Sequence, residues 1–280
     1  MSRPLATLTG FGAVLLWSAL ALLTTLSGDV PPLQLLAMCF AVGGGVGLLR
    51  GVPRGVPPVA WVVGAGGLFG YHLLYVLALR NAPPVEASLV AYLWPLLIVL
   101  LSALFDRLRW YHVAGALLGL AGAALIVTGG RGLAATPQAG HAIALAAAAT
   151  WAAYSVLSRR FASVPTTAVT GFCLAAAALS AVAHVALEDT VAPEGTEWLA
   201  IIGLGLGPMG AAFFLWDMGV KRGDLAVLGA GSYAAPLLST LVLVAAGLAE
   251  PTWTLALACL LITGGAALAA SGMLRRQPRA

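Results

Sequence analysis

Ten long apolar runs fill most of this chain and constrain its fold more strongly than any other feature. Segments that contain proline, glycine or charged residues separate the runs, whose approximate limits are 7–27, 31–49, 59–79, 84–104, 110–129, 140–158, 166–186, 197–216, 224–246 and 253–273. A helix of about 20 mostly apolar residues is long enough to cross a bilayer. Because lipid offers the backbone no hydrogen-bond partner, a crossing segment must satisfy its own polar groups, as a helix does. We therefore predict an all-α integral membrane protein with ten transmembrane helices.

The amino-acid composition agrees with lipid as the solvent of this chain. Hydrophobic residues make up 61% of its 280 positions and charged residues only 9%, whereas soluble domains carry about 25% charged residues. The connections are short, so we expect no domain outside the membrane. The first run, which follows Arg3, is too long for a signal peptide and lacks a clear cleavage site, so we expect it to remain as the first helix.

Lysine and arginine residues lie almost entirely on one side of the predicted membrane. With the N-terminus in the cytoplasm, twelve of the fourteen fall inside, namely Arg3, Arg50, Arg54, Arg107, Arg109, Arg159, Arg160, Lys221, Arg222, Arg275, Arg276 and Arg279. Arg80 and Arg131 fall outside. Since cytoplasmic loops carry the excess of basic residues in membrane proteins, we predict an N-in, C-in orientation. This asymmetry also accounts for the net charge of +4 without a nucleic-acid partner.

The second half of the chain repeats uncommon residues of the first half. Tyr-x-x-Pro-Leu-Leu occurs at 92–97 and again at 233–238, and similar offsets pair Trp17 with Trp151, Pro31 with Pro165 and Cys39 with Cys173. We predict two five-helix repeats, 1–132 and 133–280, within a single membrane domain. Because five is odd, the second repeat enters the membrane from the opposite side. Inverted repeats of this kind are typical of secondary transporters, and chance matches in a biased composition are the alternative.

Residues 81–130 resemble the end of a repeat in the EamA family of the drug/metabolite transporter superfamily. The segment combines an alanine-rich helix that carries a proline, an acidic residue in a short turn, and a glycine-rich helix. Asp106 occupies the acidic position in this half and Glu250 in the second half. The resemblance covers essentially the whole chain, and the aromatic content is most similar to that of the YddG-type amino acid exporters of bacterial inner membranes.

The resemblance implies a substrate route lined by the third, fourth, eighth and ninth helices, flanked by the first and sixth, with alternating access between the halves. Related sugar-phosphate carriers use basic residues in the central helices to hold phosphate. The fourth and ninth predicted helices, 84–104 and 224–246, contain no lysine or arginine. This departure argues against a phosphorylated substrate.

Pro95 and Pro236 interrupt the fourth and ninth predicted helices near mid-span. A proline inside a helix frees the carbonyl four residues earlier, here those of Ala91 and Ser232. Broken backbone is tolerated at mid-membrane where it lines a cavity or is buried in protein. We therefore expect both carbonyls to accept hydrogen bonds from a substrate ammonium group at one depth. A simple kink in a packed helix is the alternative.

Aromatic side chains gather near mid-depth, although Tyr and Trp are most common at the membrane interfaces. Rings that line a cavity would favour a flat apolar side chain through stacking and an ammonium group through cation–π contact. Core packing explains any single ring equally well. The predicted substrate-binding residues are Tyr71, His72, Tyr75, Tyr92, Trp94, Pro95, Trp151, Phe213, Trp216, Ser232, Tyr233, Pro236 and Ser239.

Three ionisable residues, Glu86, Asp217 and Lys221, are candidates for gating or proton coupling. Charged groups inside a membrane are costly and are often functional. Glu86 lies about one turn into the fourth helix from its outer end, and Asp217 can pair with Lys221, its i+4 neighbour, as an inner gate. Solvation at the two interfaces is the alternative for both acids. His72 fits a hydrogen-bonded packing residue better than a proton carrier.

Together these features predict a secondary transporter, not an enzyme, that exports neutral and preferably aromatic or large hydrophobic amino acids across a bacterial inner membrane by alternating access. Export of threonine, cysteine, purines or cationic drugs is the alternative. A membrane enzyme is a remote one, since the four histidines are scattered. The three cysteines show no CxxC spacing and no segment has P-loop spacing. We expect a monomer that needs a small-molecule substrate and the bilayer, and no metal, cofactor, ATP or nucleic acid.

Overall fold

A computed structural model describes residues 1–82, 84–130, 138–247 and 250–274, and every regular element in these ranges is a helix. The first half contains α1 (Arg3–Trp17), α2 (Leu20–Leu26), α3 (Pro32–Gly47), η1 (Leu48–Arg50), α4 (Pro58–Asn81), α5 (Pro84–Ala91), α6 (Trp94–Leu101), η2 (Ser102–Leu104) and α7 (Trp110–Thr128). The second half contains α8 (Ala139–Leu157), η3 (Ser158–Phe161), α9 (Ala168–Leu187), α10 (Glu197–Leu206), η4 (Gly207–Ala211), α11 (Ala212–Arg222), α12 (Leu225–Gly231), α13 (Ala234–Ala245) and α14 (Trp253–Leu274). The predicted all-α class is confirmed for this part of the chain.

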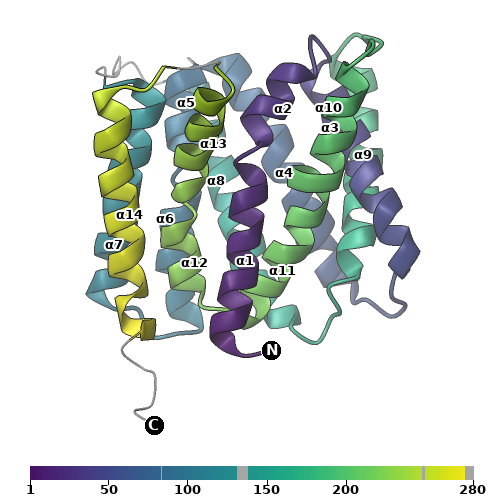
Figure 1. The fold of residues 1–280 in the computed structure, drawn as a ribbon. Helices are drawn as coiled ribbons and strands as arrows, with labels where there is room; N and C mark the ends of the chain where they lie inside the picture. Colours follow the sequence, from purple (N-terminus) through teal and green to yellow (C-terminus); the bar gives the residue numbers. More distant parts are fainter. Residues whose placement is uncertain (83, 131–137, 248–249, 275–280) are drawn as a thin grey trace.

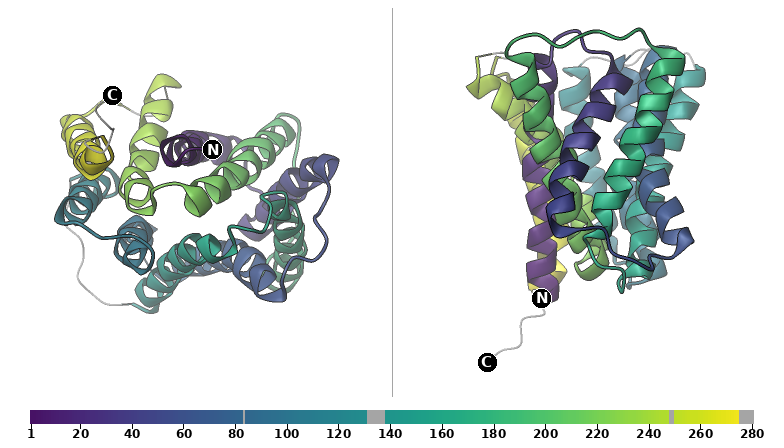
Figure 2. Two further views of the ribbon diagram at one scale, coloured as in Figure 1. Left: turned by 90° about the horizontal axis from the view of Figure 1, so that it is seen from below. Right: turned by 90° about the vertical axis from the view of Figure 1, so that its right-hand side faces the viewer.

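The helices run back and forth along one common direction (Figure 1). The N-terminus and the end of α14 lie at the lower end of this view, together with the connections 51–57, 105–109, 162–167 and 223–224. The helices α2, α5, α10 and α13 lie toward the upper end. Seen along the helix axes, α7 packs along α14 at one side of an elongated bundle, and α3 packs along α9 at the other (Figure 2).

Seven helical segments are long and apolar enough to cross a membrane, namely Arg3–Leu26, Pro32–Arg50, Pro58–Asn81, Ala139–Phe161, Ala168–Leu187, Glu197–Arg222 and Leu225–Ala245. Three shorter apolar helices, Trp94–Leu104, Trp110–Ile126 and Trp253–Ala269, accompany them. Large apolar side chains cover much of the outer surface, and Leu49, Val185 and Trp253 are 82–88% exposed. A surface of this kind suits lipid, so the chain is a multi-pass membrane protein.

The predicted end of the eighth apolar run, at residue 216, is wrong, because the structure continues this helix to Arg222. The apolar pattern stops at Asp217, but this carboxylate pairs with the Lys221 ammonium one turn later, with an O–N distance of 2.9 Å. The Lys221 and Asp217 side chains are only 4% and 2% exposed. A paired charge can therefore stay inside the helix bundle, and a simple apolar count misses this.

The other nine predicted runs match helical segments to within a few residues at each end. The predicted boundary between the repeats, at 132 and 133, lies outside the described residues. Four of the fourteen basic residues counted for the orientation, Arg131, Arg275, Arg276 and Arg279, also lie outside them.

Four of the helical segments change geometry near their middle. The α1–α2, α5–α6 and α12–α13 pairs are separated by two-residue turns, and α10 passes into α11 through the π-helix η4. Pro95, Pro208 and Pro236 lie in or directly after three of these breaks. Proline lacks the N–H donor of a helix and crowds the carbonyl four residues earlier, so it explains the position of these breaks.

In the lower half of the bundle, helices approach one another closely at glycine residues. A Cβ atom on Gly10 of α1 would lie 3.1 Å from the Cα atom of Gly219 on α11. A Cβ atom on Gly229 of α12 would lie 2.9 Å from the carbonyl oxygen of Pro95 on α6. Small residues allow backbones to pack this closely in membranes. Both contacts join the first half of the chain to the second and leave the lower half tightly packed.

We expect Gly219→Ala to destabilise the protein, because the added methyl group would lie 2.6 Å from the Gly10 Cα atom. Overpacking of this kind costs about 1–3 kcal/mol. Gly66→Ala is the matched control, because a Cβ atom on Gly66 meets no described atom within 4 Å. Thermal unfolding in detergent should show a lower midpoint for Gly219→Ala alone. Equal midpoints for the two variants would contradict the close α1–α11 contact.

Candidate functional site

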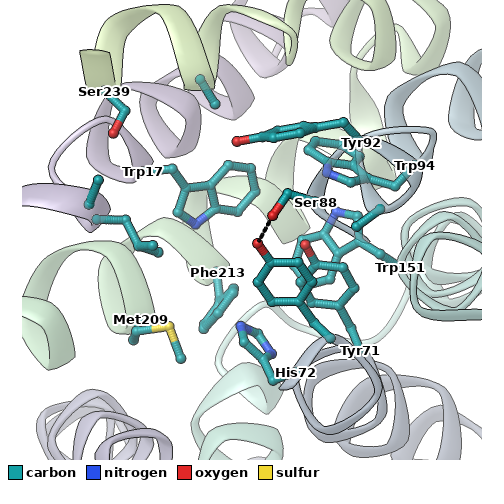
Figure 3. A pocket seen from close by; sticks show the side chains of 15 residues that line it. Trp17, Tyr71, His72, Ser88, Tyr92, Trp94, Trp151, Met209, Phe213 and Ser239 are labelled. Carbon is teal, nitrogen blue, oxygen red and sulfur yellow. Dashed lines mark hydrogen bonds between the residues drawn. The ribbon is translucent and has the colours of Figure 1, made fainter. Parts of the chain in front are cut away.

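A cavity of about 300 Å³ lies at the level of the helix breaks, between the tightly packed lower half and the upper end. It is lined by residues from α1, α2, α4, α5, α6, α8, η4, α11, α13 and the turn between α5 and α6 (Figure 3). The lining residues are Trp17, Leu20, Ala21, Tyr71, His72, Tyr75, Ser88, Ala91, Tyr92, Trp94, Trp151, Met209, Phe213, Ala235 and Ser239. Both halves of the chain contribute to this wall.

Tryptophan rings form one side of the cavity. The Trp17 ring centroid lies 6.3 Å from that of Trp94 and 5.7 Å from that of Trp151, in edge-to-face geometry. Trp94 and Trp151 are 6.2 Å apart in the same geometry. The Trp17 indole N–H donates to the carbonyl oxygen of Pro208 in η4, at 3.1 Å, which holds the ring in place. Edge-to-face contacts leave ring faces available to a flat apolar group.

Hydroxyl groups and one imidazole provide the polar part of the wall. The Tyr71 and Tyr75 rings stack with 6.1 Å between centroids, and the Tyr75 hydroxyl is 3.0 Å from the Ser88 hydroxyl. The Nδ1 atom of His72 lies 2.6 Å from the carbonyl oxygen of Leu68. None of the lining residues named above is charged. The cavity can therefore bind a group by stacking and by neutral hydrogen bonds.

The structure brings eight of the thirteen predicted binding residues together around this cavity. These are Tyr71, His72, Tyr75, Tyr92, Trp94, Trp151, Phe213 and Ser239. Trp17, which the sequence paired with Trp151 as a repeat match, also lines the cavity. Leu20, Ala21, Ser88, Met209 and Ala235 were missed, and Ala91 was expected to contribute only its carbonyl oxygen. The Gly-Pro-rich stretch 205–210 around Met209 was the one signal that could have indicated a cavity wall.

The other five predicted binding residues lie outside the cavity wall. Trp216 is fully buried behind Trp17, with 5.2 Å between ring centroids, and its indole N–H donates to Ser155 Oγ at 3.0 Å. Pro95 packs against Gly229, as described above. The remaining three, Ser232, Tyr233 and Pro236, come from the α12–α13 break.

These three residues face protein. The Ser232 hydroxyl donates to the Leu228 carbonyl oxygen at 2.6 Å, and the Ser232 carbonyl accepts from the Ala235 N–H at 3.0 Å. The Tyr233 ring packs against α7, where a Cβ atom on Gly119 would lie 2.5 Å from Tyr233 Cδ2. Pro236 is buried. The two Tyr-x-x-Pro motifs therefore lie in different surroundings, since Tyr92 lines the cavity and Tyr233 does not.

Glu86 lies on α5 above the cavity and is 8% exposed. Its Oε2 atom is 2.9 Å from His141 Nε2 on α8. The Gln138 backbone N–H donates to His141 Nδ1 at 3.0 Å, so Nδ1 carries the lone pair and Nε2–H donates to Glu86. This pair joins the two halves of the chain near the upper end.

Asp217 and Lys221 form a buried pair that does not contact the cavity. The Lys221 ammonium also donates to the Val164 carbonyl oxygen at 3.0 Å, which ties α11 to the connection before α9. Because both side chains are buried, solvation at the membrane interface does not describe Asp217.

A cluster of four charged residues lies at the lower end, and no sequence pattern had indicated that these residues would meet. The Arg3 guanidinium lies 3.0 Å from the Asp106 carboxylate and 2.9 Å from that of Asp224. The Arg159 guanidinium lies 3.2 Å from the Asp106 carboxylate. This cluster links α1, the α6–α7 turn, η3 and the α11–α12 turn. Its ion pairs hold these elements together below the packed lower half.

Within the described residues, no group of three or more His, Cys, Asp or Glu side chains could hold a metal ion. The side chains of the cavity wall offer aromatic rings, hydroxyl groups and one imidazole.

Comparison with known proteins places the chain among transporters. The model of the EamA-like transporter family matches it twice, over residues 4–128 and 138–271. The aromatic amino acid exporter YddG of Ancylobacter novellus is 57% identical over 96% of this chain and 98% of its own, and YddG of Escherichia coli is 27% identical over 96% and 97%. A solved crystal structure that is 56% identical superposes with a TM-score of 0.92 and covers 98% of this chain and 99% of its own. The chain belongs to the EamA-like transporter family.

Proposed function

We propose that this protein exports aromatic amino acids across a bacterial inner membrane as a secondary transporter and has no enzymatic activity. The observation that carries the proposal is the cavity, whose wall is rich in aromatic rings and has no charged side chain. Its volume of about 300 Å³ is at the lower end of ligand pockets, which span ~300–1,000 Å³, so it suits a ligand as small as an amino acid. The names of the YddG relatives support this substrate class.

The cavity chemistry disfavours cationic drugs, one of the alternatives that the sequence left open, and agrees with the sequence argument against phosphorylated substrates. A cationic drug would need a carboxylate or a larger aromatic cage, and Glu86, the acid on the cavity-lining helix α5, is paired with His141. A phosphorylated metabolite would need basic groups at the wall. A zwitterionic amino acid carries no net charge, so a neutral wall can bind it without leaving one charge unbalanced.

We further propose that the chain crosses the membrane ten times as two inverted five-helix repeats, with both termini in the cytoplasm. The separate family matches to each half support the repeat. The three shorter apolar helices join the seven long segments to give ten spans. The lower connections and helix ends carry Arg3, Arg50, Arg54, Arg107, Arg109, Arg159, Arg160, Lys221 and Arg222, so the lower end is the cytoplasmic one.

Transport then proceeds by alternating access, with the state described here closed toward the cytoplasm. The Gly10–Gly219 contact and the Arg3 charge cluster lie on the cytoplasmic side of the cavity. Among the gating candidates, Asp217 and Lys221 belong to this closed side. Glu86, paired with His141 on the opposite side of the cavity, is the candidate for proton exchange.

Purified protein in liposomes should carry labelled tryptophan and phenylalanine faster than threonine, and it should not carry a tetraalkylammonium cation. The aromatic wall stabilises the first two substrates by stacking, at ~0.5–1.5 kcal/mol for each ring pair. Initial rates with and without a pH gradient measure both the substrate preference and any proton coupling. Protein-free liposomes are the control.

No amino acid flux in any arm of this experiment would refute the proposed function. If a pH gradient drives flux, Glu86→Gln should remove that component and leave the gradient-independent flux in place. An unchanged response of Glu86→Gln to the pH gradient would rule out Glu86 as the coupling residue.

Tyr92→Ala should raise the apparent KM for tryptophan roughly 2- to 10-fold, since it removes one ring contact from the cavity. Tyr233→Ala is the matched control, because Tyr233 occupies the same position in the second copy of the motif but packs against Gly119 outside the cavity. This second change should lower the thermal midpoint and leave KM nearly unchanged in the protein that remains folded. Equal effects of the two changes on KM would contradict the placement of the site.

Cysteine labelling can test the orientation. In a variant without the native cysteines Cys39, Cys173 and Cys259, a single cysteine at Ala192 should react with a membrane-impermeant maleimide in intact spheroplasts. A single cysteine at Arg54 should react only after the cells are opened. The opposite pattern would show that the N-terminus lies outside.

A further inference from the structure

The hydrogen bond between His72 and Leu68 fixes the tautomer of the His72 imidazole. A carbonyl oxygen can only accept, so the Nδ1 atom, 2.6 Å from the Leu68 oxygen, must carry a hydrogen and donate it. In the neutral ring the other nitrogen, Nε2, is then an acceptor with a free lone pair. No hydrogen bond to Nε2 forms within the described residues. The helix backbone thus turns this histidine into an acceptor.

The His72 ring lies on the cavity wall, and the neighbouring rings hold it in one orientation. The ring lines the cavity and points into it (Figure 3). Four rings enclose it nearly at right angles, namely Phe40, Tyr71, Trp151 and Phe213, with centroids at 5.3, 5.0, 6.4 and 6.1 Å. These contacts hold the imidazole plane, so the direction of the lone pair is set before a substrate arrives.

We propose that His72 Nε2 accepts a hydrogen bond from the ammonium group of the substrate and thereby selects free amines over their deaminated counterparts. This inference rests on the proposed export of amino acids and assigns the polar orientation of the substrate within the same cavity. An ammonium group has only donors and needs acceptors. At His72 it finds the Nε2 lone pair together with the Tyr71 and Phe213 rings, which attract a cation.

The carboxylate of the substrate needs donors, and His72 in this tautomer offers none at the cavity. Hydroxyl groups of Tyr92 and Ser239 lie elsewhere on the wall and can donate (Figure 3). The two ends of the zwitterion thus have separate partners. A site that hydrogen-bonds one group strongly rejects analogues that lack it, because its own polar group then stays unpaired.

Two substitutions test the roles of the two His72 nitrogens separately. In His72→Asn the side-chain amide keeps a donor near the Nδ1 position, so the bond to Leu68 is retained and the acceptor is lost. In His72→Gln the side-chain oxygen can reach the Nε2 position, so an acceptor is retained at the cavity. Binding is measured with radiolabelled tryptophan on purified protein, and unlabelled tryptophan, tryptamine and indole-3-propionate compete. Tryptamine lacks the carboxylate, and indole-3-propionate lacks the ammonium group.

We expect His72→Asn to weaken the binding of tryptophan and of tryptamine roughly 10- to 100-fold, which is the effect of losing a hydrogen bond to a charged group. Indole-3-propionate should stay within about twofold of its wild-type affinity, since it never used the acceptor. His72→Gln should restore most of the affinity for both amines. Retained indole-3-propionate binding and an unchanged thermal midpoint show that the variant is folded.

Three results would overturn the inference. If His72→Asn loses affinity equally for all three ligands, His72 has a packing role. If it loses no affinity for any of them, His72 does not bind substrate. If His72→Asn loses affinity for tryptophan and indole-3-propionate but not for tryptamine, His72 binds the carboxylate of the substrate. If wild-type protein neither binds nor transports tryptophan, the proposed function itself fails, and this outcome is distinct from the other three.

Discussion

The rest of the structure depends on one constraint, which is that backbone N–H and C=O groups find no hydrogen-bond partner in lipid. Continuous helices meet it, and the described elements are all helical. A break in a helix releases polar groups, so breaks are tolerated only where protein or a cavity surrounds them. Three of the four breaks directly adjoin cavity residues, at Trp17, Tyr92 and Met209. The fourth, before α13, is followed by Ala235 on the same wall. The breaks in the helices therefore surround the cavity.

The two ends of the bundle are built differently around that feature. Below the cavity, glycine contacts and buried apolar side chains such as Leu225 and Leu228 fill the space between the halves. Toward the upper end, the walls carry hydroxyl groups and rings that leave room for a ligand. A cavity with a neutral wall above a tightly packed half matches a transporter that releases an uncharged or zwitterionic solute to one side at a time.

Most of the fold could be predicted from the sequence, because the length and polarity of each apolar run are local properties. The exception, the helix that continues through Asp217, depends on a partner four residues away and on burial by other helices. The cavity could be predicted in part. Tyr71 and Tyr75 share a helix face through i+4 spacing, and both line the wall. The Trp17 contact with Pro208 joins residues 191 positions apart, and no local pattern encodes it.

The repeated motif explains why the sequence prediction named residues on the cavity wall together with residues away from it. Tyr92 and Tyr233 occupy the same place in their motifs, so the sequence treats them as equal. In the structure Tyr92 lines the cavity and Tyr233 packs against α7, so the two copies of the motif meet different neighbours. Which copy faces the cavity depends on the helices that pack around it, and a single sequence motif does not contain this information.

The Arg3 cluster also has a consequence for how the protein is made. Arg3 leaves the ribosome before its partner Asp224, which follows 221 residues later. At about 5–20 residues per second, roughly 10–40 s separate the two. Throughout this interval the first helix sits in the membrane without its final anchor, while Asp106 and then Arg159 arrive. The Arg3 cluster at the lower end of the bundle can therefore be completed only after Asp224 has been made.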